Sequence, residues 1–266
     1  MFDSIAGDYD ALNHILSLDV DKIWRKKALK QIVDAPAPAQ VLDLACGTGD
    51  FSIAIAKALS RSHKRVGTPI EAHVKAPAKA PVEAQVTSTG FVTGDSGRSD
   101  LMTKGHVTGV DLSEGMLAVM REKVAKAGLT EMISIEEGDG ENLRFPDNTF
   151  DRVTIAFGIR NFEDRPKGLR EMLRVLKPGG RLVILELSRP ENKVIRWFYD
   201  LYFLHILPKI GGKVSGDKAA YAYLPASVAA FPGKKAFMAT MREAGFRTVT
   251  HKAFTLGICR MYTGEK

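Results

Sequence analysis

Residues 41–51 read Val41-Leu42-Asp43-Leu44-Ala45-Cys46-Gly47-Thr48-Gly49-Asp50-Phe51. The first five are nearly all apolar, as expected of a strand that is buried on both faces of a parallel sheet. Gly47 and Gly49 come next, and Phe51–Leu59 has a helical pattern. Glycines between a strand and a helix let a ligand approach the backbone, where N–H groups at the start of the helix are within its reach. The stretch therefore predicts an α/β fold with a nucleotide-type pocket.

Two classes of nucleotide ligand fit such a turn. A dinucleotide site has the pattern G-x-G-x-x-G/A, but here Ser52 stands at the third small position and Asp50 places a negative charge where a pyrophosphate would lie. The pattern D-x-A-x-G-x-G that begins at Asp43 instead resembles the first motif of class I methyltransferases. Their ligand, S-adenosylmethionine, carries a sulfonium cation and no phosphate, so acids near the turn favour it. A G-x-G pair alone is also compatible with a purely structural turn.

Two later segments also bring an acid to the end of a predicted strand. A short apolar run from Val107 ends in Asp111, and Ser113 is suited to cap the helix that follows. An acid in that place suits the two ribose hydroxyls of either ligand. A strand from Ile133 brings Asp139 to the same edge, where it can accept a bond from an adenine amino group. One such acid alone would be an ordinary solvated carboxylate, but three in a βαβ series predict one site.

The second half of the chain continues the alternation of strands and helices. Asp151–Phe157 reads as a buried strand, Arg165–Leu176 as a helix and Arg181–Leu185 as the next strand. Between the last two, Lys177-Pro178-Gly179-Gly180 is typical of a sharp turn, since proline fixes φ and glycine permits positive φ. This order of elements is similar to that of class I methyltransferases and favours their fold over that of a dehydrogenase.

The composition is consistent with one α/β domain. With 266 residues and 45% hydrophobic content, the chain can bury one sizeable core. No apolar run reaches transmembrane length and the N-terminus lacks a signal-peptide pattern, so we expect a cytoplasmic protein. The two cysteines, Cys46 and Cys259, are too few for a disulfide framework or a zinc site. The net charge of +7 suits peripheral binding to an anionic membrane surface at the inner face, and we expect no nucleic-acid partner.

One segment does not fit a compact βαβ unit. Ser60–Lys104 is rich in Ala, Pro, Lys, Thr and Gly and has neither a helical nor an alternating period. It predicts a flexible low-complexity insertion within the single domain 1–266. The insertion moves Asp111 far beyond the roughly 20 residues that separate the glycine turn from this acid in a compact unit. A surface connection tolerates such length because the entropic cost of loop closure grows only logarithmically.

Several further segments narrow the family. They are Met1–Ser17 with Tyr9-Asp10-Ala11-Leu12-Asn13, Trp24-Arg25, Phe145-Pro146-Asp147-Asn148-Thr149-Phe150-Asp151, Phe157-Gly158-Ile159-Arg160-Asn161-Phe162 and Tyr221-Ala222-Tyr223-Leu224-Pro225-Ala226-Ser227. Together they resemble the UbiE/MenG family, the C-methyltransferases of menaquinone and ubiquinone biosynthesis, over the whole chain except 60–104. The resemblance implies a Rossmann-like α/β domain, with a mostly parallel seven-stranded sheet and helices on both faces. It also implies S-adenosylmethionine-dependent C-methylation of a prenylated quinol, with demethylmenaquinol as the first candidate.

The same resemblance implies which residues bind the methyl donor. They are the glycine turn, an acid at the ribose and a pair at the adenine: Gly47, Thr48 and Gly49, then Asp111, then Asp139 and Gly140. Many relatives have a serine in place of Ala156, and alanine cannot supply that side-chain contact. We expect no metal, because displacement of a methyl group from a sulfonium does not need one.

Methylation of a quinol ring carbon needs an aligned donor and an electron-rich ring. Alignment supplies much of the acceleration, and loss or polarisation of a hydroxyl proton makes the ring carbanion-like. Because arginine stays protonated, we expect Arg160 to stabilise the quinolate or to orient the water that takes the proton. Asn161 and Tyr9 would hold the ring hydroxyls.

Other roles for these residues stay open. Arg160 is also compatible with a surface arginine that pairs with Glu163 or Asp164, and His14 and His205 are alternative bases.

The stretch Val194–Leu207 is unusually apolar and aromatic. It indicates either a buried helix over the sheet or a lid that contacts the prenyl tail and the membrane surface.

The sequence is also compatible with functions other than the quinol reaction. One is methylation of a benzoquinol of the ubiquinone pathway, or of an oxygen or nitrogen of another small metabolite. A second is a non-catalytic partner protein that binds S-adenosylmethionine, and a third is a dehydrogenase. The sequence also leaves open the tail length and whether the chain forms a homo-oligomer or joins a quinone-biosynthesis complex.

Overall fold

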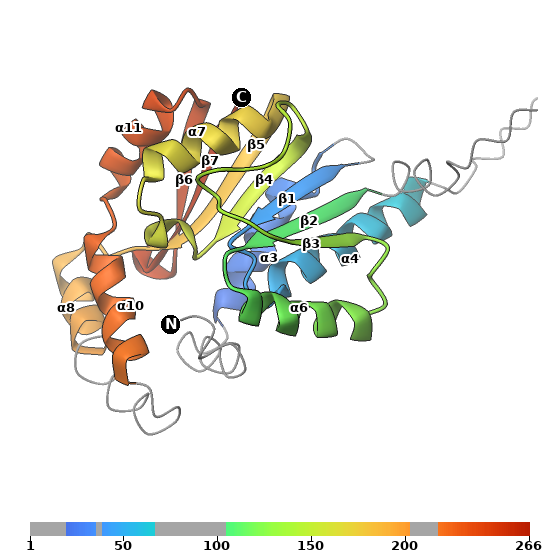
Figure 1. Cartoon of the computed structure of the whole chain (residues 1–266). Coiled ribbons are helices and arrows are strands. Elements are labelled where there is room, and N and C mark those ends of the chain that lie inside the picture. The colour runs from blue at the N-terminus through green and yellow to red at the C-terminus, as the bar shows by residue number, and fades with distance from the viewer. Residues whose placement is uncertain (1–19, 36–38, 67–104, 203–217) are drawn as a thin grey trace, which may run out of the picture.

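The computed structural model describes residues 20–35, 39–66, 105–202 and 218–266. Its centre is a seven-stranded sheet with the order β3-β2-β1-β4-β5-β7-β6 (Figure 1). In chain order the strands are β1 Gln40–Leu44, β2 His106–Asp111, β3 Ile133–Glu137, β4 Phe150–Ala156, β5 Leu176–Leu187, β6 Arg247–Phe254 and β7 Cys259–Glu265. The first five pair in parallel, while β7 runs antiparallel to both β5 and β6. The predicted mostly parallel α/β sheet is confirmed.

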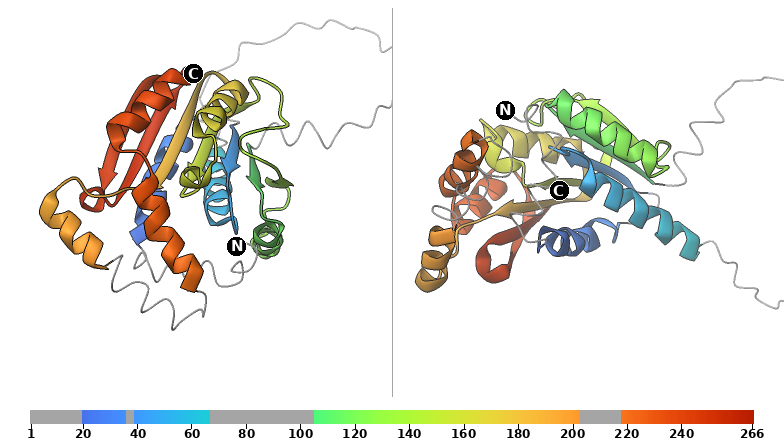
Figure 2. Two further views of the ribbon diagram at one scale, coloured as in Figure 1. Left: turned by 60° about the vertical axis from the view of Figure 1, so that its left-hand side comes forward. Right: turned by 90° about the horizontal axis from the view of Figure 1, so that it is seen from below.

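Helices cover both faces of this sheet (Figures 1 and 2). One face carries α7 Arg165–Val175 and α11 Lys234–Glu243. The other carries α3 Val20–Ile32, α4 Asp50–Val66 and α6 Glu114–Lys126. Two more helices, α8 Lys193–Leu201 and α10 Lys218–Ala230, pack on each other beyond the carboxyl ends of the strands. Short 3-10 turns follow β4 (η1 Ile159–Asn161) and β6 (η3 Thr255–Gly257).

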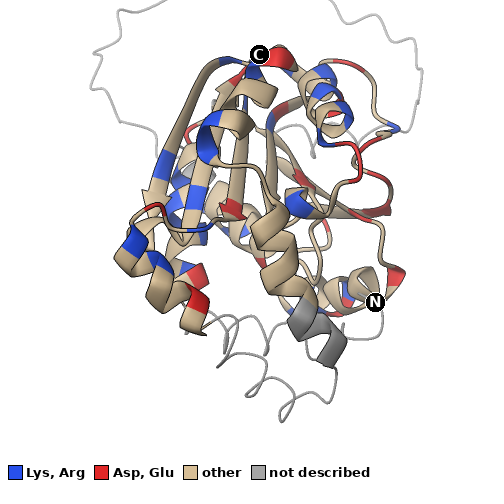
Figure 3. Cartoon of the chain, turned by 90° about the vertical axis from the view of Figure 1, so that its left-hand side faces the viewer, with Lys and Arg blue, Asp and Glu red and all other residues tan. Residues whose placement is uncertain are grey.

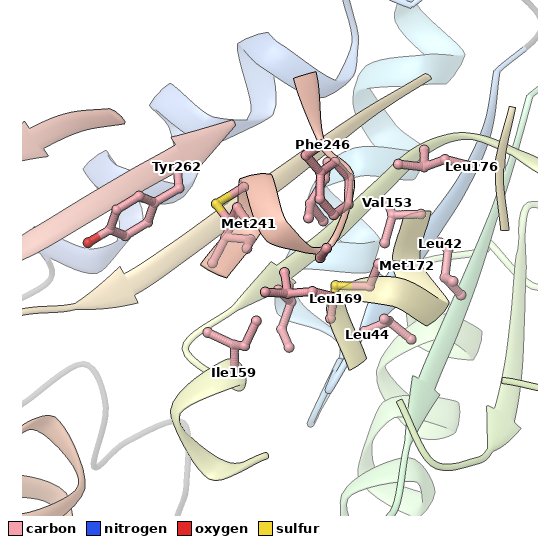
Figure 4. Close-up of a cluster of buried hydrophobic side chains, with 14 of the residues drawn as sticks. Leu42, Leu44, Val153, Ile159, Leu169, Met172, Leu176, Met241, Phe246 and Tyr262 are labelled. Carbon is pink, nitrogen blue, oxygen red and sulfur yellow. The ribbon is translucent and has the colours of Figure 1, made fainter. Parts of the chain in front are cut away.

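Two hydrophobic cores result, one on each face of the sheet. Successive residues of β1 alternate between them, since Val41 packs with α3, α4 and α6 whereas Leu42 packs with α7 and α11. Figure 4 shows the core beneath α7 and α11, in which Leu169 and Met172 of α7 approach Met241 of α11 over the central strands. Burial on both faces explains why the central strands read as continuous apolar runs.

The predicted helix starts follow from side-chain caps. Ser113 accepts the N–H of Met116 at 3.2 Å and begins α6 one residue before the sequence predicted. Asp164 accepts the N–H of Lys167 at 2.9 Å and begins α7. The side chain of Asn192 accepts the N–H of Val194 at 2.9 Å and begins α8. Each cap satisfies N–H groups that have no partner inside the helix.

Two segments differ from the sequence-based expectation. The helix predicted over Phe51–Leu59 continues to Val66, so Ser60–Val66 belong to α4, while 67–104 lie outside the described residues. The predicted Lys177–Gly180 turn is a bulge within β5: Leu176 pairs with Phe150, but Arg181 already pairs with Arg152.

The apolar stretch after β5 also needs a correction. In its described part, α8 buries Tyr199 but exposes Val194, Trp197, Phe198 and Leu201. The interpretation as a helix buried over the sheet is therefore wrong for this segment, because the described residues pack against only one side of α8.

Candidate active site

A cavity of about 320 Å³ opens at the carboxyl edge of the parallel strands. Its lining comes from the segments that directly follow four strands and from α6: Ala45, Gly47, Asp111, Leu112, Met116, Gly138, Asp139, Gly140, Glu141, Ala156, Phe157, Gly158, Asn161, Phe162 and Glu163. Four of the predicted cofactor residues are therefore brought together here, namely Gly47, Asp111, Asp139 and Gly140. Parallel strands end at one edge, which is why segments far apart in the sequence meet at one site.

In the glycine turn after β1, one residue lines the cavity and two others contact neighbouring parts of the protein. Gly47 lines the cavity, whereas Gly49 and Thr48 do not. A Cβ on Gly49 would lie 2.4 Å from Cγ of Met120, so its absence lets α4 approach α6. Thr48 is buried, and its hydroxyl accepts a bond from Lys123 at 3.3 Å.

Asp111 connects two of these loops. One carboxylate oxygen accepts the N–H of Gly47 at 2.8 Å and the other accepts the N–H of Ser113 at 2.9 Å. The carboxylate is thus held at the wall of the cavity by backbone donors. These two backbone bonds occupy two of the roughly four acceptor positions that a carboxylate has.

The adenine side predicted from Asp139 and Gly140 is shaped by the ring of Phe162, for which the sequence indicated no role. Asp139 accepts the N–H of Glu141 at 2.8 Å, which closes a tight turn after β3. A Cβ on Gly140 would lie 2.5 Å from the ring of Phe162, and one on Gly168 would meet the same ring. Phe162 lines the cavity. The only hint of this ring in the sequence is a pair of glycines, Gly140 and Gly168, which both leave room for it.

The charges of the cavity have one sign. Among the described residues its lining includes the carboxylates of Asp111, Asp139, Glu141 and Glu163 and no lysine or arginine. Such a wall favours a cationic ligand and opposes a pyrophosphate by Coulomb repulsion. Asp50 does not add to this charge, because it lies outside the lining and pairs with Lys123.

The segment after β4 turns sharply over the cavity. Phe157 has φ of +63°, which is unusual for an aromatic residue, and Ala45 after β1 has φ of +48°. Residues held in this region are strained by about 1–3 kcal/mol and occur preferentially at functional sites. Asn161, at the end of η1, lines the cavity.

Arg160 lies behind this wall and does not line the cavity. It is buried, and its guanidinium donates to Glu186 at 2.8 Å and to the carbonyl of Phe157. The backbone N–H of Arg160 donates to the other oxygen of Glu186 at 3.1 Å. The alternative of a surface arginine paired with Glu163 or Asp164 is therefore wrong.

Two residues near the predicted catalytic pair were not identified from the sequence. Glu186 is fully buried in β5, and a single acid in the run Leu182–Leu187 was a signal for a buried ion pair. Tyr223 of α10 donates its hydroxyl to Oδ1 of Asn161 at 2.9 Å. It belongs to the Tyr221–Pro225 motif, which indicated the family but no role for this residue.

Asp43 is buried beneath the glycine turn. Its carboxylate accepts the hydroxyl of Ser52 at 2.6 Å. Desolvation raises the pKa of Asp43 to about 7, and the negative charge of Asp111 adds to this, against the opposing effect of Ser52 and Arg25. Burial and the same two carboxylates raise the pKa of the Cys46 thiol well above its usual range, which argues against a nucleophilic cysteine.

The remaining predicted residues cannot be placed. Tyr9, His14 and His205 lie outside the described residues. Within the described ranges, no group of three or more His, Cys, Asp or Glu residues could hold a metal ion.

Comparisons with known proteins identify the family of this chain. The model of the ubiE/COQ5 methyltransferase family matches residues 1–266. A demethylmenaquinone methyltransferase of Bacteroides fragilis is 40% identical over all of this chain and 91% of its own length. A ubiquinone/menaquinone biosynthesis C-methyltransferase UbiE of Geobacter sulfurreducens is 44% identical, over all of this chain and 87% of its own length. The solved structure of an S-adenosylmethionine-dependent methyltransferase from Aquifex aeolicus superposes with a TM-score of 0.54 at 19% identity, over 90% of this chain and 88% of that one. The predicted class I methyltransferase fold is confirmed.

Substitution of Asp43 by asparagine tests the buried carboxyl. Because its pKa is raised from 3.8 to about 7 on folding, the folded state binds the proton more tightly. This contribution to stability is complete below about pH 4 and is lost as the pH rises through 7. The free energy of unfolding of wild type, minus that of Asp43→Asn, should fall across this range by up to about 1.4 kcal/mol per pH unit. Denaturant titrations of both proteins at several pH values measure it, and parallel pH profiles would contradict the assignment.

Proposed function

The chain belongs to the ubiE/COQ5 methyltransferase family, and we propose that it transfers a methyl group from S-adenosylmethionine to a ring carbon of a prenylated quinol. Demethylmenaquinol is the proposed acceptor, since the Bacteroides fragilis relative is named a demethylmenaquinone methyltransferase. A prenylated benzoquinol is the second candidate, because the Geobacter sulfurreducens relative is named for both quinones.

One observation carries the donor half of the proposal: the cavity wall has carboxylates and no basic side chain among the described residues. S-adenosylmethionine supplies a methyl group on a positively charged sulfur and has no phosphate to be repelled. Gly47 and Asp111 would hold its ribose side, and Asp139 with Gly140 would hold its adenine. Thr48 and Gly49 support the turn from behind, through Lys123 and Met120.

The overall reaction forms a carbon–carbon bond at the ring, breaks the carbon–sulfur bond of the donor and releases one proton. The protein therefore has to align the ring with the methyl group and stabilise negative charge on a ring oxygen. Asn161 is the residue we assign to that oxygen. Its Oδ1 accepts the hydroxyl of Tyr223, which leaves the amide N–H groups as donors to an oxyanion.

Arg160 keeps its positive charge in this scheme. An arginine does not act as the base near neutral pH, and its ion pair with Glu186 holds η1, from which Asn161 lines the cavity. We propose that Arg160 positions this turn and supplies positive charge behind it, while water takes the proton. Tyr9 stays a proposed contact to a ring hydroxyl.

The proposed acceptor carries a prenyl chain, which partitions into lipid. No helix among the described residues has the length and apolarity to span a bilayer. We propose peripheral contact with the membrane surface, at which the chain would take its acceptor. A homo-oligomer or a complex with other enzymes of the pathway stays a prediction.

A methylation assay tests the function against its alternatives. Purified full-length protein is incubated with labelled S-adenosylmethionine and either a short-chain demethylmenaquinol, a benzoquinol or a catechol. Transfer to the ring carbon of the naphthoquinol supports the proposal. Transfer only to an oxygen, or binding of the donor without transfer to any acceptor, would refute it in favour of the metabolite methyltransferase or the non-catalytic partner.

Asp111→Ala should weaken binding of S-adenosylmethionine by at least about 100-fold, because two charge-assisted hydrogen bonds to the donor are lost. The control is Glu137→Ala. Glu137 is an exposed acid on β3 that lies opposite Asp111 in the register of β2 and β3, and it does not line the cavity. Isothermal calorimetry measures both affinities. Wild-type affinity in Asp111→Ala would show that this carboxylate has no part in the donor site.

Tyr223→Phe removes the hydroxyl that donates to Asn161. We expect kcat to fall by about 10-fold, because one hydrogen bond that positions Asn161 is lost, and we expect the affinity for the methyl donor to stay unchanged. Asn161→Ala should lower kcat further, and adding Tyr223→Phe to it should have no additional effect, because Tyr223 acts through Asn161. Ser227→Ala, which removes a hydroxyl bond within the same helix, is the control. Additive losses in the double variant would contradict the coupling.

Arg160→Lys keeps a cation opposite Glu186 but cannot serve the same set of acceptors. We expect kcat to fall by at least about 10-fold while donor affinity stays near that of wild type. The control is Arg152→Lys, a buried arginine that pairs with Asp34 at the opposite end of β4. Lysine is preferred to alanine because alanine would leave a buried carboxylate without a cation. Undiminished turnover in Arg160→Lys would remove the assignment.

A further inference from the structure

Helix α8 presents an apolar stripe to solvent. Val194, Trp197, Phe198 and Leu201 follow the spacing i, i+3, i+4, i+7 of one helix face and are 66%, 61%, 60% and 39% exposed. The rings of Trp197 and Phe198 contact edge to face, with centroids 4.9 Å apart. On the opposite side, Tyr199 is buried against α10. The helix is thus anchored by one face and leaves four large apolar side chains uncovered by the described residues.

The turn η3 between β6 and β7 adds a fifth apolar side chain. Leu256 is 72% exposed and has φ of +57°, a conformation that branched residues rarely adopt. The indole N–H of Trp24 in α3 donates to Thr255 at 2.8 Å, and Ser188, just before α8, donates to the carbonyl of Gly257 at 2.7 Å. The turn is therefore tied to α3 on one side and to the segment leading into α8 on the other.

Helix α3 contributes a basic face. Ile23, Lys26, Lys27 and Lys30 follow the same i, i+3, i+4, i+7 spacing and are exposed. In the described part of the chain, no carboxylate pairs with any of the three lysines. Figure 2, right, shows α3 (blue), the turn between β6 and β7 (red) and α8 (orange) following one another along one side of the molecule.

The acids beside α8 are neutralised. Glu191 pairs with Lys234 at 2.8 Å and with Arg260 at 3.3 Å, and Asp200 pairs with Arg189. Lys193 is exposed at the start of the helix, and Figure 3 shows further basic segments on and beside α8. The α3–η3–α8 face therefore combines projecting apolar side chains with excess positive charge.

We propose that the α3–η3–α8 face docks on an anionic phospholipid bilayer, with the α8 stripe and Leu256 in the headgroup region and the lysines of α3 on the lipid phosphates. This inference rests on the proposed function only in that a prenylated acceptor gives the chain a reason to bind membrane. A helix with one aromatic and aliphatic face and cations around it is typical of an interfacial anchor, and basic side chains near an anionic surface add attraction that salt weakens. An apolar protein partner would not require the lysines.

Vesicle sedimentation with the full-length protein tests this docking, without quinol or methyl donor present. Wild type should bind vesicles that contain phosphatidylglycerol as well as phosphatidylcholine. It should bind far less to vesicles of phosphatidylcholine alone, and binding to the anionic vesicles should weaken at high salt. Trp197→Ala/Phe198→Ala and Lys26→Glu/Lys30→Glu should each lower binding by at least about 10-fold. The matched charge control is Lys167→Glu/Lys235→Glu, two exposed lysines on the helices of the opposite sheet face, which should bind like wild type.

Fluorescence supplies a second measurement. Trp197 is one of two tryptophans in the chain, and Trp24 is buried. Vesicles should shift the emission of wild type to shorter wavelength, and Trp197→Phe should still bind but lose the shift. Absence of vesicle binding, equal binding by all variants, or a change of oligomeric state in Trp197→Ala/Phe198→Ala without a change in vesicle binding would overturn the proposal. Methyl transfer to a short-chain quinol, assayed separately in the same variants, should be unaffected, so failure of docking and failure of the proposed function are distinguished.

Discussion

The carboxylate of Asp111 holds the N–H groups of Gly47 and Ser113 at once, and the arrangement of the cavity depends on this contact. It joins the turn after β1 to the start of α6 and places a negative charge at the wall. Burial is the main cause of the raised pKa of Asp43, and this charge adds to it. Backbone N–H groups hold this carboxylate in place, so a negatively charged group joins the turn to the start of the helix. The cavity can therefore be acidic and still be held together.

A second ionic contact organises the opposite wall. The pair of Arg160 and Glu186 is buried, and buried ion pairs add little net stability because desolvation offsets their attraction. What the pair does provide is a defined position for η1, and through it for Asn161. Tyr223 of α10 reaches the same amide from outside the sheet. The helix pair α8–α10 is thus connected to the cavity on one side and carries the exposed apolar stripe on the other.

The sequence predicted the sheet and five residues of the cavity lining, four for the cofactor and Asn161 for the acceptor, because their signals are local. An apolar run, a glycine turn and an acid at the end of a strand are each read within about ten residues, and the parallel topology then brings the acids to one edge. It did not predict Glu186 or Tyr223, which meet their partners 26 and 62 positions away in the chain. Such pairings depend on how strands and helices pack, and no local pattern encodes them.

By itself, the sequence determined the α/β class, the order of the elements, the family and the acidic character of the site. Only the tertiary structure decided which residues face the ligand. It separated Gly47 from Gly49 and Asn161 from Arg160, neighbours in the chain that point to different surroundings, and it exposed one face of an apolar helix whose composition alone suggested burial. The physical reason is that side-chain type sets what a residue can bind, whereas backbone direction and packing set what it meets.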